Sequence, residues 1–226
     1  MHINFLRSTP TLDPKRRDEK SVYQLYWTEP AAIKAYAQLL LSRYQDSYKL
    51  ALDLGCNDGR WLELFRREGI TIDTSYGVDI RPVERCYCDI FSQIDVVETE
   101  FEPIFNLVVS NPPFGNELHK FIQKAFEAVD RQNGLISFFV PITQLATGRN
   151  KRLIWDKYPF TRMVTYSTRP HCERNKQGKP SSYPGREIVQ FEWYFQDGFL
   201  QNATDYDMPV AEWITYERDG RLEEID

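Results

Sequence analysis

The sequence has few of the residues that build metal centres and disulfide frameworks. Its 226 residues include four cysteines and three histidines. No two cysteines have the C-x-x-C spacing typical of zinc sites and redox motifs, and the histidines are scattered along the chain. We therefore predict neither a metal site nor a set of structural disulfides. The cysteines are interpreted as reduced thiols, and Cys56 is a candidate to line a pocket.

Long apolar runs are also absent. No run approaches the roughly 20 residues that a helix needs to cross a bilayer. The N-terminal stretch MHINFLRSTPTLDPKRRDEK lacks the basic and then apolar layout of a signal peptide. We therefore expect a cytoplasmic protein. The chain length and its 42% hydrophobic content predict one main domain with a sizeable core.

The sequence contains no standard phosphate-binding motif. Neither G-x-x-x-x-G-K-[ST] nor G-x-G-x-x-G occurs in it. A different glycine-containing turn, LDLGCNDG, follows an apolar run, and Gly55 and Gly59 would let the backbone turn tightly and approach a ligand. A bland tight turn is the alternative interpretation. The pattern favours a cofactor without phosphate groups over a dinucleotide or ATP.

Positive charge is concentrated in one segment of an acidic chain. The net charge is −5, yet residues 149–186 hold ten Lys and Arg residues against two acids. Such a segment is a candidate surface for contacting nucleic-acid phosphates. A solvated loop and helix face is the alternative. The candidate contact residues are Arg149, Lys151, Arg169, Lys176 and Lys179.

Apolar periodicity predicts an α/β fold in which strands alternate with helices. Helices are expected at 29–44, 58–69 and 117–131, and strands at 48–55, 75–80, 85–90, 105–110, 134–141, 161–168 and 187–195. The alternation predicts a doubly wound, mostly parallel, seven-stranded sheet. The last two strands have no long helix between them, so we expect them to form an antiparallel pair.

The same pattern divides the chain into three parts. Residues 1–20 form a polar N-terminal arm, 21–196 the main domain and 197–226 an acidic C-terminal extension.

Three acids stand at the expected ends of successive strands. They are Asp53, Asp79 and Asp89. In open parallel sheets, ligands bind at the carboxyl ends of the strands. Asp79 follows Asp53 by 26 residues, in the range where an acid at the end of the second strand binds ribose hydroxyls. The three acids together predict a cofactor that contains a nucleoside.

A strand ends abruptly in the stretch LVVSNPPFGN, residues 107–116. Proline has no backbone N–H and a fixed φ, so Pro112 and Pro113 cannot continue a central strand beyond Asn111. The result is a stiff loop that presents an amide side chain, backbone carbonyls and the ring of Phe114. This arrangement favours the binding of a flat group. The alternative is a structural loop stiffened by proline.

With LDLGCNDG, VDI, CDI and SNPPF in this order, the chain resembles class I S-adenosylmethionine-dependent methyltransferases over residues 21–196. Within them it resembles the amino-methylating group marked by [DNS]-P-P-[YFW]. The resemblance implies a Rossmann-like fold and S-adenosylmethionine as cofactor. It implies these cofactor contacts: Asp53 and Gly55 beside the methionine portion, Asp79 on the ribose, and Asp89 and Ile90 on the adenine. Asn111 is also expected among the cofactor contacts.

The segment YWTEPAAI resembles the T-P-like turn that lies at the methionine carboxylate in adenine-N6 DNA methyltransferases. Thr28 is the matching position, and the inserted Glu29 is a departure. The segment RPHCERNKQGKPSS with the later FEWYF also resembles small phage and bacterial DNA adenine methyltransferases. A cytosine-C5 enzyme needs a Pro-Cys nucleophile, and no Pro-Cys dipeptide occurs.

The resemblance implies that the SNPPF loop is the catalytic centre for methylation of adenine N6 in DNA. Asn111 Oδ1 and the Pro112 carbonyl would accept the two hydrogens of the amine, which releases its lone pair for attack. Pro113 would stiffen the loop, and Phe114 would stack on a base flipped out of the duplex. A neutral amine attacks, so no general base is proposed.

Three alternatives to DNA adenine methylation stay open. The substrate could be an RNA adenine or a protein glutamine, although Phe114 replaces the tyrosine usual for glutamine and no N-terminal helical domain is predicted. The chain could also be a non-catalytic nucleic-acid-binding subunit of the same fold. Only about thirty residues follow FEWYF, so the target sequence could be short, specificity could be relaxed, or a partner could supply it.

Overall fold

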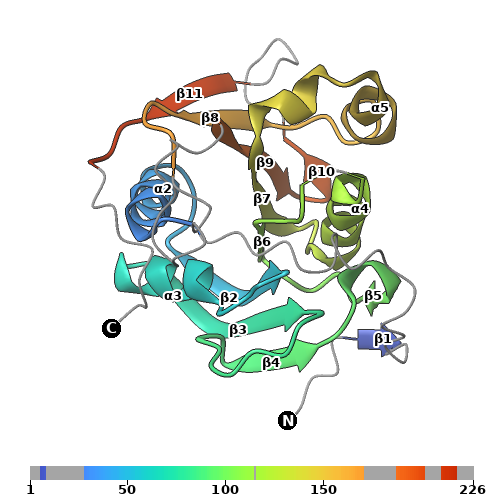
Figure 1. Cartoon of the computed structure of the whole chain (residues 1–226). Coiled ribbons are helices and arrows are strands. Elements are labelled where there is room, and N and C mark those ends of the chain that lie inside the picture. The colour runs from blue at the N-terminus through green and yellow to red at the C-terminus, as the bar shows by residue number, and fades with distance from the viewer. Residues whose placement is uncertain (1–5, 9–27, 115, 171–186, 202–209, 218–226) are drawn as a thin grey trace, which may run out of the picture.

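The computed structural model describes residues 6–8, 28–114, 116–170, 187–201 and 210–217. Within them, a twisted nine-stranded sheet runs through the middle of the molecule (Figure 1). The strand order is β11-β8-β9-β7-β6-β2-β3-β4, and β10 pairs with β9. These strands are β2 (Ser47–Leu54), β3 (Thr71–Asp79), β4 (Ile90–Gln93), β6 (Leu107–Ser110), β7 (Asn133–Pro141), β8 (Arg162–Tyr166), β9 (Ile188–Gln196), β10 (Phe199–Leu200) and β11 (Val210–Ile214).

The strand directions match the predicted mixed sheet. Strands β4, β3, β2, β6 and β7 are parallel neighbours, whereas β9 lies antiparallel between β7 and β8. The predicted antiparallel pair at the C-terminal side is thus confirmed. The sheet is wider than the seven strands expected, because β10 and β11 join it. Strand β11 pairs in parallel with β8, so the acidic extension contributes to the main sheet. A separate small sheet pairs β1 (Leu6–Ser8) with β5 (Glu100–Phe101).

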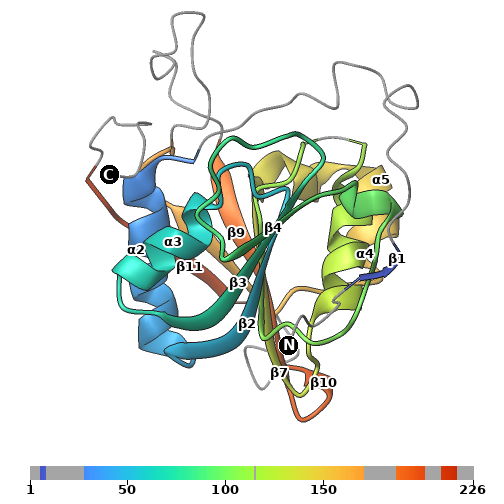
Figure 2. The ribbon, with the colours of Figure 1, turned by 90° about the horizontal axis from the view of Figure 1, so that it is seen from below.

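Helices cover both faces of the sheet. Helices α2 (Pro30–Arg43) and α3 (Arg60–Arg67) lie on one face. On the other face lie α4 (Leu118–Ala128), α5 (Gly148–Asn150) and the π-helical turn η4 (Lys151–Trp155), as Figure 2 shows. The short 3-10 segments are η2 (Val96–Glu98) and η3 (Ile142–Ala146). No helix in the described part of the chain is long and apolar enough to span a membrane.

Each face of the sheet has its own apolar core. Phe138 and Phe139 are adjacent on β7 and therefore point to opposite faces. Phe138 packs in the layer with Trp193 and the buried side of α4, and Phe139 packs against Trp61 in the layer with α2 and α3. Both phenylalanine side chains are fully buried. The continuous apolar run of β7 is thus explained by burial on two sides.

Helices α2 and α3 begin and end within two residues of the predicted bounds, whereas α4 ends three residues before the predicted end at residue 131. Pro30 occupies the first helical position of α2, where its missing N–H costs nothing. Helix α3 is followed by Gly69, whose φ of 104° lies in the left-handed region. The buried residues of α2, from Ala32 to Leu40, recur at helical spacing on its sheet side.

One predicted strand is wrong. Residues 85–89 are not in a strand. The third parallel strand is β4, which begins only at Ile90 and pairs with β3 from Tyr76↔Ile90 to Asp79↔Gln93. The preceding segment is held by the loop after β2 instead, through the Tyr87 N–H and the Asp58 carbonyl (2.8 Å). Asp89 therefore stands at the amino end of its strand, not at the carboxyl end.

A buried polar network joins α2 to the antiparallel part of the sheet. The Glu192 carboxylate on β9 is fully buried and accepts hydrogen bonds from Tyr36 Oη (2.6 Å) and Tyr44 Oη (2.7 Å). Burial raises the pKa of Glu192, although the hydrogen bonds from both tyrosines oppose this effect. Ser137 Oγ contacts Tyr36 Oη (2.8 Å) and extends the network to β7.

Candidate functional site

Strand register brings three of the predicted site residues together at the carboxyl ends of the parallel strands. Asp53 on β2 pairs with Gly77 on β3 and with Val109 on β6. Asp79 and Asn111 each lie two positions beyond this row, so they stand on either side of the loop that leaves β2. The predicted convergence of these residues follows from the parallel pairing of their strands.

The loop after β2 is a tight left-handed turn tied to β3. Gly55, Asn57 and Gly59 have φ values of 75°, 51° and 78°. Glycine adopts such values without steric cost, and asparagine tolerates them better than most residues. The N–H groups of Gly55 and Cys56 both donate to the Val78 carbonyl (2.8 and 2.9 Å). The turn therefore holds a fixed position beside the end of β3.

Asp53 is a buried acid with unused bonding capacity. Its residue is 1% exposed, and no donor in the described part of the chain reaches its Oδ2 atom. Burial raises the pKa of Asp53, and Cys86, Asp58 and Asp79 add to this effect. A buried oxygen without a donor is costly, so its presence in a native protein calls for an explanation, and a bound ligand that supplies the donor is one. Asp53 is thus suited to receive a cationic or N–H donor.

Asp79 is buried and its carboxylate is held by its own chain. Its Oδ2 accepts from the Asn57 N–H (2.9 Å) and from Arg81 Nη2 (2.9 Å). Its Oδ1 accepts from the Arg81 backbone N–H (2.9 Å) and from Arg81 Nε (3.0 Å). These four bonds use the four acceptor positions of a carboxylate. Arg81 was not among the predicted site residues, although it follows the acid by only two positions.

The amide of Asn111 is hydrogen-bonded to Thr28, which lies 83 residues earlier in the sequence. Asn111 Nδ2 donates to Thr28 Oγ1 (2.9 Å), and the same oxygen accepts from Trp61 Nε1 (3.2 Å). Thr28 is 2% exposed and Trp61 is 5% exposed. The sequence predicts Thr28 and Asn111 as site residues, but it gives no sign that Trp61 joins them, because the contact depends on tertiary packing.

The proline loop is anchored in the core. Pro112 is buried, and Phe114 is half-buried and packs against apolar side chains of both layers. Ser110 Oγ, directly before the loop, donates to the Leu54 carbonyl of β2 (2.6 Å). These contacts fix where the loop leaves the sheet, and little reorganisation is then needed when a ligand arrives.

Asp89 and Ile90 do not have the surroundings that were predicted. Asp89 accepts from Arg66 Nη2 (2.5 Å), and from the Ser75 N–H (2.7 Å) and hydroxyl (2.9 Å). Ile90 packs on the layer that contains α4. The acid at the carboxyl end of β4 is Asp95, whose Oδ1 caps η2 by accepting from the Val97 N–H (2.9 Å). Asp95 directly follows the apolar IFSQI segment, and this was the signal that the sequence offered.

Three of the five predicted nucleic-acid contacts lie in the described part of the chain. Arg149 on α5 bonds to the Asn116 side chain, so it stands just after the proline loop. Lys151 pairs with Asp156 (2.6 Å), and Arg169 pairs with Glu187. Lys176 and Lys179 lie outside the described residues.

Another cation of the basic segment has a structural role. Arg162 on β8 lies 3.8 Å from Glu212 and faces the Tyr44 ring. It is therefore part of the packing between β8, β11 and α2, not of an exposed surface.

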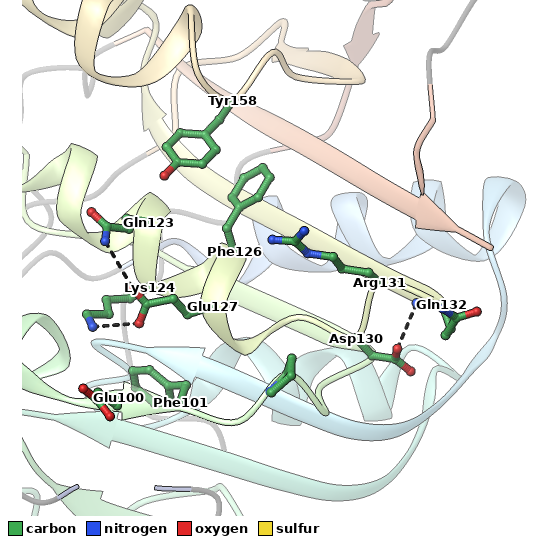
Figure 3. Close-up of a pocket in the computed structure, with 11 residues that line it drawn as sticks. Glu100, Phe101, Gln123, Lys124, Phe126, Glu127, Asp130, Arg131, Gln132 and Tyr158 are labelled. Carbon is green, nitrogen blue, oxygen red and sulfur yellow. Dashed lines mark hydrogen bonds and ion pairs between the residues drawn. The ribbon is translucent and has the colours of Figure 1, made fainter. Parts of the chain in front are cut away.

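A separate pocket lies at the opposite end of the parallel strands, near the amino end of β7, and has a cavity volume of about 770 Å³ (Figure 3). Its lining residues come from β5, the second half of α4 and the residues just before β7. Lys124 pairs with Glu127 on its wall (2.7 Å), and the Phe126 and Tyr158 rings lie 4.4 Å apart. None of the predicted site residues lines this pocket.

Comparison with known proteins was made by sequence and by structure. No protein-family model matches the chain, and no curated protein matches its sequence. A protein of Pyrococcus horikoshii, provisionally described as an RNA methyltransferase, superposes with a TM-score of 0.56 and 19% identity over 80% of this chain and 91% of the other.

A Listeria monocytogenes protein, provisionally described as a class I S-adenosylmethionine-dependent methyltransferase, gives a TM-score of 0.54 and 13% identity over 86% of this chain. The match covers 65% of the Listeria protein. A Thermoplasma acidophilum protein gives 0.51 and 18% over 80% of this chain and 96% of the other. At these identities the likeness establishes the fold, which is the Rossmann-like fold of class I methyltransferases.

Proposed function

We propose that this protein is an S-adenosylmethionine-dependent methyltransferase that methylates the N6 amine of adenine in DNA. The observation that carries the proposal is the position of Asn111. Asn111 directly follows β6 and precedes the two prolines, donates a hydrogen bond to Thr28, and stands at the same end of the strands as Asp53 and Asp79. The fold places cofactors at this end of the strands.

The residues at this end of the strands fit S-adenosylmethionine. Its ammonium group matches the buried Asp53 Oδ2, which lacks a donor among the described residues. Its ribose hydroxyls match Asp79, and they would replace the Arg81 guanidinium there. Its adenine amine matches Asp95, which we propose in place of Asp89. When bound, the cofactor supplies a methyl group activated by an adjacent sulfonium.

The proline loop would hold the amine that is methylated. Asn111 Nδ2 donates to Thr28, so Oδ1 is the atom that would accept one amine hydrogen. The Pro112 carbonyl would accept the second. Holding both hydrogens turns the nitrogen lone pair out of conjugation with the ring, so it can attack carbon. Because Thr28 and the prolines fix these acceptors beforehand, the transition state gains their stabilisation without reorganisation.

Nucleic acid is the substrate class that the surroundings of the loop support. Arg149 is hydrogen-bonded to Asn116, two residues beyond Phe114, and it is the first residue of the basic segment 149–186. Cations at this place can position phosphates while a flipped base stacks on Phe114. RNA is the second candidate, because the Pyrococcus structure with a TM-score of 0.56 is provisionally described as an RNA methyltransferase.

Methyl transfer to three polymers in parallel tests the proposal. The protein is incubated with S-adenosylmethionine labelled in its methyl group and with unmethylated duplex DNA, structured RNA or a protein extract. Nucleosides and amino acids are then analysed by mass spectrometry. We expect N6-methyldeoxyadenosine from DNA, and no label in a control duplex whose adenines are already methylated.

Label in RNA or protein alone would contradict the DNA assignment while keeping the catalytic loop. Cofactor binding without any transfer would favour a non-catalytic subunit.

A further inference from the structure

Cys56, in the loop after β2, converges with Cys86 and Cys88, which lie 30 and 32 residues later in the sequence. Cys56 and Cys88 are buried, and Cys86 is half-buried. A Cβ atom added to Gly77 would lie 2.8 Å from Cys56 Sγ and 2.9 Å from Cys88 Sγ. One added to Gly59 would lie 2.7 Å from Cys88 Sγ and 3.1 Å from Cys86 Sγ. The three sulfur atoms therefore form one cluster, for which two glycines make room.

The cluster is connected to the loop after β2 at two points. Cys56 is part of the loop itself and stands next to Asn57, whose N–H binds Asp79. Cys86 and Cys88 flank Tyr87, whose N–H donates to the Asp58 carbonyl of the same loop. A change in the distances between the sulfurs must consequently move the loop relative to the segment before β4.

The pKa values of Cys86 and Cys56 are shifted in opposite directions. Hydrogen bonds from Cys56 and Cys88 stabilise a thiolate at Cys86 and so lower the pKa of Cys86. The hydrogen bond to Cys86 raises the pKa of Cys56, and burial adds to this effect. A partly accessible thiolate with neighbouring thiols has the features of an oxidation-sensitive cysteine with a resolving partner.

We propose that the cluster is an oxidation site at which a peroxide converts Cys86 and Cys56 into a disulfide. The Cys86 thiolate attacks one peroxide oxygen, the O–O bond breaks, and Cys86 becomes a sulfenic acid while hydroxide leaves and takes a proton. The Cys56 sulfur then attacks the Cys86 sulfur, and water leaves with the Cys56 proton. Two thiols are oxidised to one disulfide, and one peroxide is reduced to two waters.

The disulfide would displace the loop after β2. An S–S bond is about 2.05 Å long, well below the separation of two non-bonded sulfurs. Its formation pulls Cys56 toward Cys86 and draws the Asn57 N–H away from Asp79. This step rests on the proposed function: oxidation lowers affinity for S-adenosylmethionine by about tenfold or more, the scale of a lost hydrogen bond to a charged group.

Peroxide treatment of the reduced full-length chain tests the oxidation site without reference to activity. Intact mass and peptide mapping should show the loss of two hydrogen atoms and a Cys56–Cys86 cross-link that dithiothreitol reverses. Cys56→Ser and Cys86→Ser should abolish this cross-link, whereas the control Cys172→Ser should keep it. Absence of a Cys56–Cys86 cross-link in the folded wild-type chain would overturn the proposal.

Two further readouts separate this proposal from the proposed function. Hydrogen exchange in residues 55–59 should rise on oxidation, and unchanged exchange would contradict the coupling to the loop. Calorimetric titration with S-adenosylmethionine should show weaker binding after oxidation and recovery after reduction. If the reduced chain binds no S-adenosylmethionine, the proposed function fails, and the mapped cross-link still decides the oxidation site.

Discussion

The hydroxyl oxygen of Thr28 accepts a hydrogen bond from the Asn111 amide and so orients it. We predict that Thr28→Val, which keeps the shape but removes the hydroxyl, slows methyl transfer roughly ten- to a hundredfold, the scale of a small misplacement at a reacting centre. The matched variant Thr28→Ser retains the oxygen and should stay near the wild-type rate. Single-turnover kinetics measure both. Equal rates for the two variants would show that the Thr28 contact with Asn111 has no part in catalysis.

Two acids on either side of β4 provide a second comparison at the residue scale. Asp95→Asn keeps an oxygen to cap η2 but loses the negative charge, and we predict that S-adenosylmethionine binds several-fold more weakly. Asp89→Asn should leave this affinity unchanged, because the Asp89 carboxylate is held by Arg66 and Ser75. Calorimetric titration compares the two. A loss confined to Asp89→Asn would restore the assignment made from sequence.

These two acids show what the sequence could predict about the site. The positions of Asp53, Asp79 and Asn111 were predictable, because each follows a strongly apolar parallel strand. The prediction put Asp89 at the carboxyl end of a strand because the short segment before it, from residue 85, resembles a strand. The start of β4 is decided instead by its pairing with β3. The contact between Trp61 and Thr28 was not predictable, because it depends on how α3 packs.

Among the secondary-structure elements, α2 is held to β9 by two tyrosine hydroxyls that donate hydrogen bonds to the buried Glu192 carboxylate. We predict that Tyr36→Phe lowers the free energy of unfolding by about 1–3 kcal/mol, because Glu192 loses a donor that water cannot replace. The control Tyr158→Phe removes a hydroxyl from the wall of the open pocket in Figure 3 and should cost much less. Urea denaturation measures both, and equal losses would contradict a structural role for this network.

Element directions were the most predictable feature of the fold, and the edges of the sheet the least. Alternating strands and helices indicated the parallel strands from β2 to β7, because a parallel neighbour requires a crossover. Strand β11 was not expected, since its sequence VAEWI stands in an acidic context and leaves Trp213 72% exposed. Its pairing with β8 is favoured by the contacts of Glu212 with Arg43 and Arg162, which are distant in sequence.

At the scale of the whole molecule, charge is distributed unevenly about the sheet. Arg149, Lys151 and Arg169 belong to the basic segment, whereas the pocket at the opposite end of the strands is lined by cations and acids together. We propose that this segment forms the nucleic-acid-binding face of an acidic protein.

Salt dependence of nucleic-acid binding tests that face. We predict that the double variant Lys151→Gln, Arg169→Gln weakens duplex DNA binding and makes the slope of log affinity against log salt shallower by about 1 per lost phosphate contact. The control double variant Lys49→Gln, Lys124→Gln removes the same charge from elsewhere and should keep the slope. Fluorescence anisotropy across a salt series measures both, and identical slopes would reduce the basic segment to a solvated surface.

The role of Asn111 in catalysis is tested by the rate at which Asn111→Ala transfers methyl groups to the polymer that the wild-type protein labels. We expect the rate to fall roughly a hundredfold or more at saturating S-adenosylmethionine, with cofactor affinity nearly unchanged, because one preorganised acceptor is lost. The loop control Asn116→Ala should retain turnover. A near-normal rate for Asn111→Ala would show that the proline loop does not hold the amine that is methylated.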